Sequence, residues 1–520
     1  MKATGQSRGW RIYYFPPPSP PARAQTRIMQ FIRFHLHQPN QAPTARRSPR
    51  ERASLLTALL TIATSGCASQ PPASSRAADQ PRPPPTEESS ALLQAETFDQ
   101  VWSIIRDTHP DPSINQGSWN EARLLFRERA IAATTLESFR ATLQDMMQTL
   151  GDSHFAIIPN AVAGSATAVG GWSGMTVQVI DGAAIVTSVL PGSPAEEAGI
   201  RPSWRVLRSE GDSIDAVLAE IPQPRTALER STRDRIINAY LRGRPGMSPE
   251  MEFVDTAGVA HTARFTFEAP PGEVVTLGNL PPMPASCSAR VLTPTEIAAL
   301  GVDPAKVGRV GLLCFTIWMP ALAQQIDAAL FGFRDVDALV IDLRGNPVGI
   351  AVMVSGVAGH LLDEPTSLGQ MQGRSMRLDF KANPRIVDGS GVQVGTIRAP
   401  VAILIDGLSG STSEMFAGGL VDIGRAEVFG HCTAGAALPA TTHPLKNGDI
   451  LLHAIADFRT PSGVSIEGSG VCQRIGPAPT AGDYAAQPEA ELQDALRWIA
   501  SELAQTKPSA TTPPTASTSE

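Results

Sequence analysis

The second half of the chain alternates between apolar runs and segments with helical spacing. The apolar runs read VGRVGLLCFTIW, VDALVIDLRG and APVAILIDG, and segments 320–333, 349–362 and 412–424 follow them in turn. Strands that alternate with helices form a mostly parallel sheet, because each helix carries the chain back across the sheet. We therefore predict that residues 285–505 form an α/β core, which ends in an amphipathic helix over 487–505.

Two further units precede this core. Residues 91–160 contain three segments with apolar residues at three- and four-residue spacing, which predicts a small helical bundle. Residues 165–270 contain short strands, a turn and a short helix, in an order that resembles a PDZ domain. Such a domain binds the end of another chain by strand addition. An unrelated small β-domain is the alternative. The PDZ resemblance implies a carboxylate-binding loop and strand at Gly174, Met175, Thr176 and Val177.

The first 67 residues have the composition of a targeting region. Residues 1–66 hold ten of the 43 Lys and Arg residues but only one acid, Glu51. In ARRSPRERASLLTALLTIATSGCAS, basic residues precede a short apolar run, and small residues precede Cys67. The run is too short for a permanent membrane span. The pattern resembles a bacterial lipoprotein signal, which implies an exported protein anchored in the cell envelope or periplasm through lipidated Cys67. An ordinary cleaved secretory signal is the alternative.

The rest of the chain is acidic and contains two polar segments. Residues 68–90 are rich in Pro and Ser, and residues 506–520 are poor in apolar side chains, so both are predicted to be disordered. Beyond residue 66 the net charge is −16. A chain of that charge is a poor ligand for nucleic acid, whose binding depends on phosphate neutralisation. The sequence leaves the oligomeric state open.

The cysteines indicate disulfides rather than metal binding. Apart from Cys67, the chain has Cys287, Cys314, Cys432 and Cys472, which allow three pairings in an exported protein. No Cys or His spacing is typical of a metal site, and no cofactor is implied.

Four short motifs carry side chains suited to chemistry. They are LGDSHFAI, DLRGNPVG, SGSTSEMFAGGL and SIEGSGV. Their residue types, order and separation resemble the carboxyl-terminal processing and tricorn-core family of serine peptidases, and the order of the three units does too. The resemblance covers roughly residues 93–505. It implies a ClpP/crotonase-like core and a serine endopeptidase of exported proteins. Such an enzyme acts through an acyl-enzyme on protein or peptide substrates with accessible C-terminal regions.

The resemblance identifies Ser411 as the nucleophile. It precedes the Ser-Glu pair of its motif by two residues and lies where a predicted strand passes into a helix. Backbone N–H groups at a helix start can stabilise an oxyanion. The expected donors are the N–H groups of Thr412 and of Val348 or Gly349. Taken alone, Ser411 could equally be a helix cap.

The expected proton acceptor is His154. The processing branch of the family uses a lysine about two dozen residues after the serine, where this chain has Ala436. The tricorn branch instead uses a histidine, assisted by a neighbouring serine and a distant glutamate. These match His154, Ser153 and Glu467. Imidazole titrates near neutrality, so it can both take and return a proton.

The missing lysine leaves a second function open. A catalytically inactive descendant would bind peptides or hydrophobic ligands in the cell envelope. Lys446, the nearest lysine downstream, is predicted to lie in a solvated hairpin turn. The resemblance also implies a supporting role for Asp422, eleven residues after Ser411. A solvated acid at the helix end is the alternative for Asp422.

Overall fold

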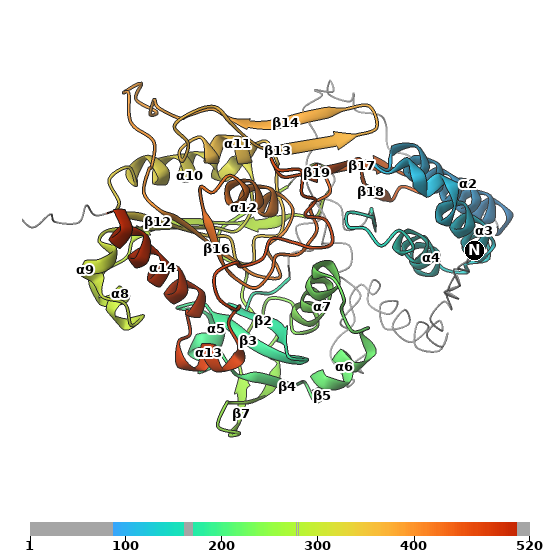
Figure 1. The fold of residues 1–520 in the computed structure, drawn as a ribbon. Coiled ribbons are helices and arrows are strands. Elements are labelled where there is room, and N and C mark those ends of the chain that lie inside the picture. The colour runs from blue at the N-terminus through green and yellow to red at the C-terminus, as the bar shows by residue number, and fades with distance from the viewer. Residues whose placement is uncertain (1–86, 161–169, 277, 279, 507–520) are drawn as a thin grey trace, which may run out of the picture.

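The computed structural model describes residues 87–160, 170–276, 278 and 280–506 (Figure 1). The predicted lipidation residue Cys67, most of the predicted tether and all but one residue of the predicted tail lie outside these ranges. Within them, no helix is both long enough and apolar enough to cross a bilayer.

A five-stranded sheet forms the centre of the α/β core, in the order β10-β11-β12-β15-β16. Its strands β11 (Val310–Phe315), β12 (Ala338–Asp342), β15 (Val401–Ile405) and β16 (Glu427–Gly430) pair in parallel. The edge strand β10 (Cys287–Val291) pairs antiparallel with β11. The predicted mostly parallel sheet is confirmed, and β10 and β16 extend it beyond the three strands that the apolar runs predicted.

Helices cover both faces of this sheet, because its strands are apolar on both faces. In β12, Leu339 and Ile341 join the large apolar cluster on one face, whereas Val340 joins the cluster on the other. The first face packs against α10 (Pro320–Gly332), α11 (Met353–Ala358) and α12 (Thr412–Asp422). The second packs against α8 (Pro294–Ala299), α9 (Pro304–Val307) and α14 (Ala490–Thr506). Figure 1 shows these two groups above and below the sheet.

The predicted helix over 349–362 is mostly wrong. Only Met353–Ala358 is α-helical. The preceding residues Val348 and Ile350 instead hydrogen-bond to the backbone of Trp318, at 3.1 Å and 2.8 Å. This pairing draws the turn before α11 towards the start of α12, where the nucleophile is expected.

The three predicted helices of the bundle are confirmed. They are α2 (Glu87–Thr108), α3 (Ser118–Ile131) and α4 (Leu136–Gln148), with the short 3-10 helix η2 (Pro112–Gln116) between the first two. Helix α2 begins inside the predicted tether. The apolar core of the bundle also includes Leu438, Leu445 and Leu451 from the C-terminal half. The bundle therefore packs as part of the core rather than as a separate unit.

A hairpin of the core packs beside the GDSHF motif and the bundle. Strands β17 (Ala440–Pro444) and β18 (Ile450–Ala454) pair antiparallel, as the Asn-Gly turn predicted, and β18 also pairs with β1 (Ala156–Ile158). Strand β1 follows the GDSHF motif directly. The motif is therefore fixed to the bundle on one side and to the core hairpin on the other.

A six-stranded sheet and three helices form a separate β-domain, which we call the inserted domain, residues 170–268. The strand, turn and short helix that the sequence predicted are present. The strands are β2 (Met175–Ile180), β3 (Ala183–Val189), β4 (Arg205–Ser209), β5 (Asp212–Ser213), β6 (Glu250–Val254) and β7 (Ala260–Arg264). The helices are α5 (Pro194–Glu197), α6 (Ile214–Glu220) and α7 (Ala227–Tyr240).

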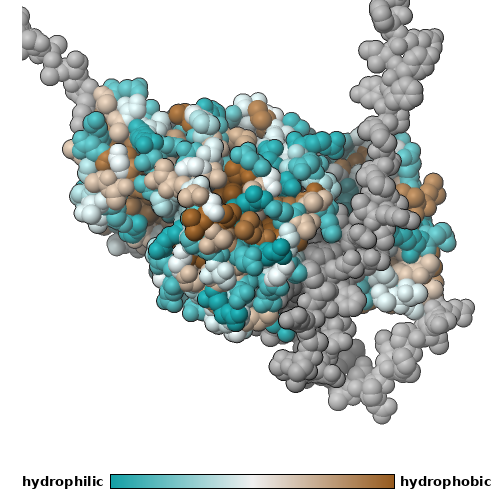
Figure 2. Space-filling view, turned by 90° about the horizontal axis from the view of Figure 1, so that it is seen from below, coloured by the Kyte–Doolittle hydropathy of each residue, from teal (hydrophilic) through white to brown (hydrophobic). Residues whose placement is uncertain are grey.

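Five further strands form two small sheets. Strands β8 (Glu273–Val275) and β9 (Met283–Ala285) pair between the inserted domain and the core, and β13 (Thr366–Gly373) pairs with both β14 (Arg377–Ala382) and β19 (Ala456–Arg459). In Figure 1 the β13–β14 hairpin lies above the sheet, whereas the inserted domain lies below it. Seen from below, apolar side chains gather in a band across the middle of the molecule (Figure 2).

Candidate active site

Ser411 lies at the start of α12 in an unusual backbone conformation. Its φ is +54°, in the left-handed region that side chains disfavour. Among the described residues only five non-glycine residues have positive φ, and His154 is another, with φ +65°. Backbone strain of this kind gathers at functional sites. The Ser411 hydroxyl is buried and has no hydrogen-bond partner in the described ranges, although Ser411 and Glu414 occupy the two positions of a capping box at the start of α12.

A buried carboxylate fixes the backbone around Ser411. Ser411 N–H donates to Glu414 Oε2 at 2.9 Å, and Glu414 also accepts from the hydroxyl of Thr433 at 2.6 Å. The N–H groups of Gly435 and Ala436 donate to the same carboxylate, at 2.7 Å and 2.9 Å. Burial raises the pKa of Glu414, against these hydrogen bonds. In the sequence, Glu414 served only to locate the serine. Its position three residues into a helix could have suggested that it accepts from the Ser411 amide.

The position matched to the family lysine lies beside Ser411. Ser411 N–H also donates to the carbonyl of Ala436, at 3.0 Å. The methyl group of Ala436 cannot accept a proton. Lys446 lies in the exposed turn between β17 and β18, as predicted, and forms an ion pair with Glu96 at 2.9 Å. No lysine is therefore placed to serve Ser411 within the described residues.

Ser153, His154 and Glu467 come together as the sequence predicted. The hydroxyl of Ser153 donates to Glu467 Oε2 at 3.0 Å and lies 2.6 Å from His154 Nδ1. The amide of Ser153 donates to Glu467 Oε1 at 2.7 Å. When Glu467 is ionised the hydroxyl is committed as a donor, so it accepts from Nδ1–H and leaves the lone pair on Nε2. Arg474 pairs with Glu427 at 2.9 Å and not with Glu467.

The last link of this relay is open. His154 Nε2 and Ser411 Oγ are both buried and without hydrogen-bond partners in the described ranges. Burial and the nearby Arg235 guanidinium lower the pKa of His154 to about 3, so the imidazole is neutral. Burial raises the pKa of Glu467 to about 8, although Ser153 and Ala437 donate hydrogen bonds to it. The relay is thus formed as far as the imidazole, and no hydrogen bond joins His154 to Ser411 in the described ranges.

The expected oxyanion donors lie at the same end of α12. The N–H of Thr412 is a first-turn group that no preceding turn can satisfy. Its side-chain hydroxyl donates to the carbonyl of Gly349 at 2.9 Å, which holds the two residues together. The backbone of Trp318 hydrogen-bonds to Val348 O and Ile350 N. The Gly349 N–H lies between these two groups and takes no part in this pairing. The side chain of Val348 packs into the large apolar cluster.

Gly349 is required by this close approach. A methyl group on its Cα would lie 2.2 Å from Trp318 Cβ and 2.3 Å from Trp318 O. Trp318 in turn donates from Nε1 to Ser413 Oγ at 2.9 Å, and Ser413 donates to Asn346 O at 3.0 Å. These buried contacts fix the turn from 346 to 349 against the first turn of α12. Trp318 was not predicted as a site residue, because nothing in its segment indicates a contact with Ser413, which lies far away in the chain.

Asp422 does not lie near the reactive groups. It ends the eleven-residue helix α12 that Ser411 begins, so the helix rise places it roughly 16 Å from Ser411. Its carboxylate accepts from the amide and the hydroxyl of Ser462, at 2.6 Å and 2.7 Å. Asp422 therefore holds the turn that precedes Glu467, rather than remaining a solvated acid.

Helix α7 of the inserted domain covers the site. Its first amide, Ala227 N–H, donates to Gly468 O at 2.9 Å, next to Glu467. Further along, a methyl group on Gly410 would lie 3.1 Å from the Arg235 guanidinium. Ser411 and His154 are only 1% and 2% exposed. The structure therefore shows a covered site. The contact between α7 and this site was not predicted from the sequence.

The predicted peptide-binding strand β2 is also occupied by α7. The side-chain amide of Asn238 accepts from Val177 N–H at 3.0 Å and donates to Val177 O at 2.6 Å. Asp234 accepts from Val179 N–H at 2.7 Å. A peptide can add to this edge only by displacing these side chains. The predicted loop residue Gly174 packs against Ser193, and with φ +78° it must be glycine.

A disulfide joins the two loops that flank the site. Of the possible pairings, Cys432–Cys472 is formed, and Cys287 and Cys314 are free. The two free cysteines lie on the adjacent strands β10 and β11. Because Cys287 is opposite Phe315, the neighbouring Cys314 faces the other side of the sheet from Cys287. Next to the disulfide, Thr433 N–H donates to Val471 O at 2.9 Å. The crosslink therefore stabilises the loops that carry Ala436 and Glu467.

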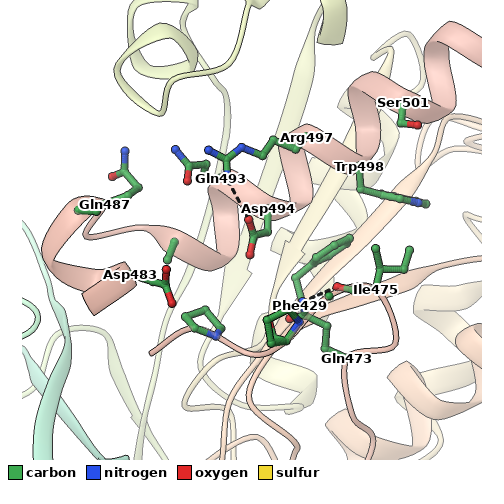
Figure 3. A pocket seen from close by; sticks show the side chains of 15 residues that line it. Phe429, Gln473, Ile475, Asp483, Gln487, Gln493, Asp494, Arg497, Trp498 and Ser501 are labelled. Atoms are coloured by element: carbon green, nitrogen blue, oxygen red, sulfur yellow. Dashed lines mark hydrogen bonds and ion pairs between the residues drawn. The ribbon is translucent and has the colours of Figure 1, made fainter. Parts of the chain in front are cut away.

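A separate groove of about 550 Å³ lies on the other side of the core. It runs between α13 (Ala481–Ala486), α14 and the loop 473–479, with Phe429 and Trp498 on its apolar side (Figure 3). None of the predicted catalytic residues lines it. The described residues contain no cluster of His, Cys, Asp or Glu able to hold a metal ion.

Comparison with known proteins points to serine peptidases. Residues 308–476 match the model of peptidase family S41. The chain is 25% identical over 387 residues to the chloroplastic C-terminal processing peptidase of Tetradesmus obliquus, which covers 72% of this chain and 75% of that protein.

Two solved structures show the same fold. The photosystem II D1 C-terminal processing protease superposes with a TM-score of 0.50 at 19% identity, over 80% of this chain and 98% of that chain. Mature CPAF, solved in complex with lactacystin, superposes with a TM-score of 0.53 at 15% identity, over 80% and 99%. The matched region contains Ser411, the DLRGN turn and Glu467. Residues 308–476 thus resemble peptidase family S41, and these likenesses together support a serine peptidase similar to the C-terminal processing proteases.

Proposed function

We propose that this protein is an endopeptidase of exported proteins in which His154, rather than a lysine, activates Ser411. The observation that carries the proposal is the buried Glu467–Ser153–His154 relay, which ends in an unpartnered Nε2 while the Ser411 hydroxyl is also unpartnered. Buried polar groups are normally satisfied, so two unsatisfied ones in one site indicate a missing step or ligand.

The proposed reaction follows from these positions. Ser411 Oγ attacks the substrate carbonyl carbon and gives its proton to His154 Nε2. The N–H groups of Thr412 and Gly349 stabilise the oxyanion. His154 then donates that proton to the leaving amine, which leaves an acyl-enzyme on Ser411, and water releases the acyl group by the same route. Glu467, through Ser153, stabilises the imidazolium that forms in each half of the reaction.

The disulfide supports an oxidising location for the protein. Disulfides persist in exported proteins and are rare where thiols are kept reduced. The Cys432–Cys472 pair therefore fits the cell envelope or periplasm that the lipoprotein-like signal implies. Anchoring through Cys67, and substrates presented by their C-terminal regions, belong to the same proposal.

The first prediction concerns the nucleophile. The purified chain is expected to cleave an unfolded protein, and Ser411→Ala is expected to reduce kcat by about a million-fold, to background, because no other group forms the acyl-enzyme. Product appearance by gel and mass spectrometry measures this, with Ser288→Ala, a change at an exposed serine of β10, as the control. A well-folded parent that cleaves no substrate would instead favour a peptide-binding protein without catalysis, which the missing lysine suggests.

We further propose that the inserted domain regulates access to Ser411. Helix α7 covers the site through Arg235, which lies beside Gly410, and it occupies the edge of β2 through Asn238. A C-terminal peptide that displaced Asn238 from β2 would shift α7, and with it the cover over Ser411. Ligand binding would then favour an open state that already exists at low population.

The second prediction tests this coupling. Asn238→Ala removes two hydrogen bonds that a peptide must otherwise displace, and each is worth roughly 1 kcal/mol. The Kd for a labelled C-terminal peptide is therefore expected to fall by about 30-fold, as measured by fluorescence anisotropy. Asn120→Ala, on the surface of α3, is the control. The coupling does not exist if Asn238→Ala leaves the Kd unchanged and saturating peptide leaves the limited-proteolysis pattern of the parent unchanged.

A further inference from the structure

The GDSHF turn that carries His154 is held from the bundle by a second histidine. His109 follows the last residue of α2 and is 3% exposed. Its Nε2 lies 3.0 Å from Asp152 Oδ2, and its ring stacks on Phe155 with centroids 5.7 Å apart. His109 thus contacts the turn on both sides of the Ser153-His154 pair.

The hydrogen bonds of His109 are consistent with one tautomer. Nδ1 lies 3.1 Å from both the amide and the carbonyl oxygen of Asp111, and the tautomer in which it accepts from the amide is the one that leaves Nε2 free to donate. The proton then lies on Nε2, which donates to the carboxylate of Asp152. Arg374 also donates to His109 O at 2.7 Å, from the hairpin between β13 and β14. His109 is thereby fixed on several sides and is a rigid support.

The turn itself needs external support. His154 has φ +65°, and Gly151, three residues earlier, has φ +76°. Such a backbone persists only where surrounding contacts determine it. Ser153 is tied to Glu467 on the core side. On the bundle side, the contacts come from His109 and from Gln144, which donates to Phe155 O at 3.1 Å.

We propose that His109 is a positioning residue for the catalytic base, which makes the helical bundle part of the catalytic apparatus. His109 holds Asp152 and Phe155, and these fix the backbone between them so that Nε2 of His154 points where Ser411 can reach it. The proposal rests on the function assigned to His154 above. It differs from a purely structural role, because bundle contacts elsewhere would not affect the orientation of the imidazole.

A matched contact provides the control. Arg140 of α4 pairs with Asp449, next to β18, at 2.7 Å, so it also ties the bundle to the core. This ion pair is as buried as the His109 contact but does not touch the GDSHF turn. Arg140→Gln is therefore expected to affect stability without affecting catalysis.

The third prediction is tested in the full chain with His109→Ala, His109→Gln and Asp152→Ala. Asp152 is one-third exposed, so its variant is expected to fold even if His109→Ala does not. In both alanine variants kcat is expected to fall by about 10- to 100-fold with KM nearly unchanged, as expected when a reactive group is misplaced. Arg140→Gln is expected to stay within about 2-fold of the parent. His109→Gln retains a donor for Asp152 and is expected to recover part of the loss.

A second readout does not depend on peptidase activity. The ring ¹⁵N shifts of His154 are expected to report one tautomer in the parent and a mixture of tautomers in Asp152→Ala. A parent that cleaves nothing would overturn the proposed function and leave this readout to decide the positioning role. Unchanged ¹⁵N shifts and kcat in Asp152→Ala, or an equal kcat loss in Arg140→Gln, would overturn the positioning role itself.

Discussion

Replacement of His154 by Ala is expected to reduce kcat by about 10,000-fold or more, with little change in KM. The Ser411 hydroxyl is a weak nucleophile until a base takes its proton, and the relay ends at His154. The position matched to the family lysine holds Ala436, so no second base replaces it. Loss of a triad histidine in other serine peptidases has an effect of this size. Steady-state kinetics on a quenched peptide substrate measures the effect.

The pH dependence of kcat separates His154 from Glu467. His154 has a pKa of about 3 in the covered site and is already neutral, whereas the pKa of Glu467 is raised by burial to about 8. The rate is therefore expected to rise with pH as Glu467 loses its proton near pH 8. Glu467→Gln is expected to remove this step and to lower kcat by about 1,000-fold or more. A rate that rises near pH 6.5 instead would indicate an exposed histidine and contradict the covered site.

Stability should follow the opposite trend with pH. A carboxyl group whose pKa is raised on folding favours the folded state while it is protonated, below its unfolded value of 4.5. That contribution is lost as pH rises from there to about 8. The free energy of unfolding of the parent is thus expected to fall over this range relative to Glu467→Gln. Urea denaturation at pH 5 and pH 8.5 measures the difference.

Arg344→Ala is expected to lower the free energy of unfolding by about 3–5 kcal/mol. The side chain of Arg344, in the DLRGN motif, is 17% exposed and pairs with Asp342 at 2.6 Å and Glu489 at 3.0 Å. It also donates to Glu491 at 3.2 Å, whose other oxygen accepts from Tyr484. Removal of the guanidinium leaves three neighbouring carboxylates without their cation. Urea denaturation followed by circular dichroism measures the loss.

A surface arginine on α14, the helix that carries Glu491, supplies the control for this prediction. Arg497 of α14 pairs with Asp494 at 3.3 Å, and its side chain is 59% exposed. Exposed pairs of this kind contribute about 0–1 kcal/mol. Arg497→Ala is therefore expected to be nearly neutral. Equal losses in the two variants would show that the network around Arg344 does not join the DLRGN turn to α14.

Local patterns predicted much of the architecture. The alternation of apolar runs and helical segments gave the parallel strands β11, β12 and β15, and the spacing in residues 91–150 gave the helices of the bundle. Strand β16 was missed because it has only four residues, too few to show a strand pattern of their own. The residues before α11 were predicted as helix because their apolar pattern does not show that their backbone pairs with Trp318.

The sequence by itself determined the chemical groups of the site, because each lies in a short motif of suitable residue types. Ser411, His154, Ser153 and Glu467 could be chosen in this way. Only the tertiary structure decided how they meet, since Ser153 and Glu467 are joined across more than 300 residues.

The tertiary structure also decided what surrounds the relay. Glu414 fixes the serine turn, α7 covers the site, and His109 supports the histidine turn from the bundle. The contacts of α7 and His109 depend on packing between segments far apart in the chain, and no local pattern of hydrophobicity or spacing encodes such packing.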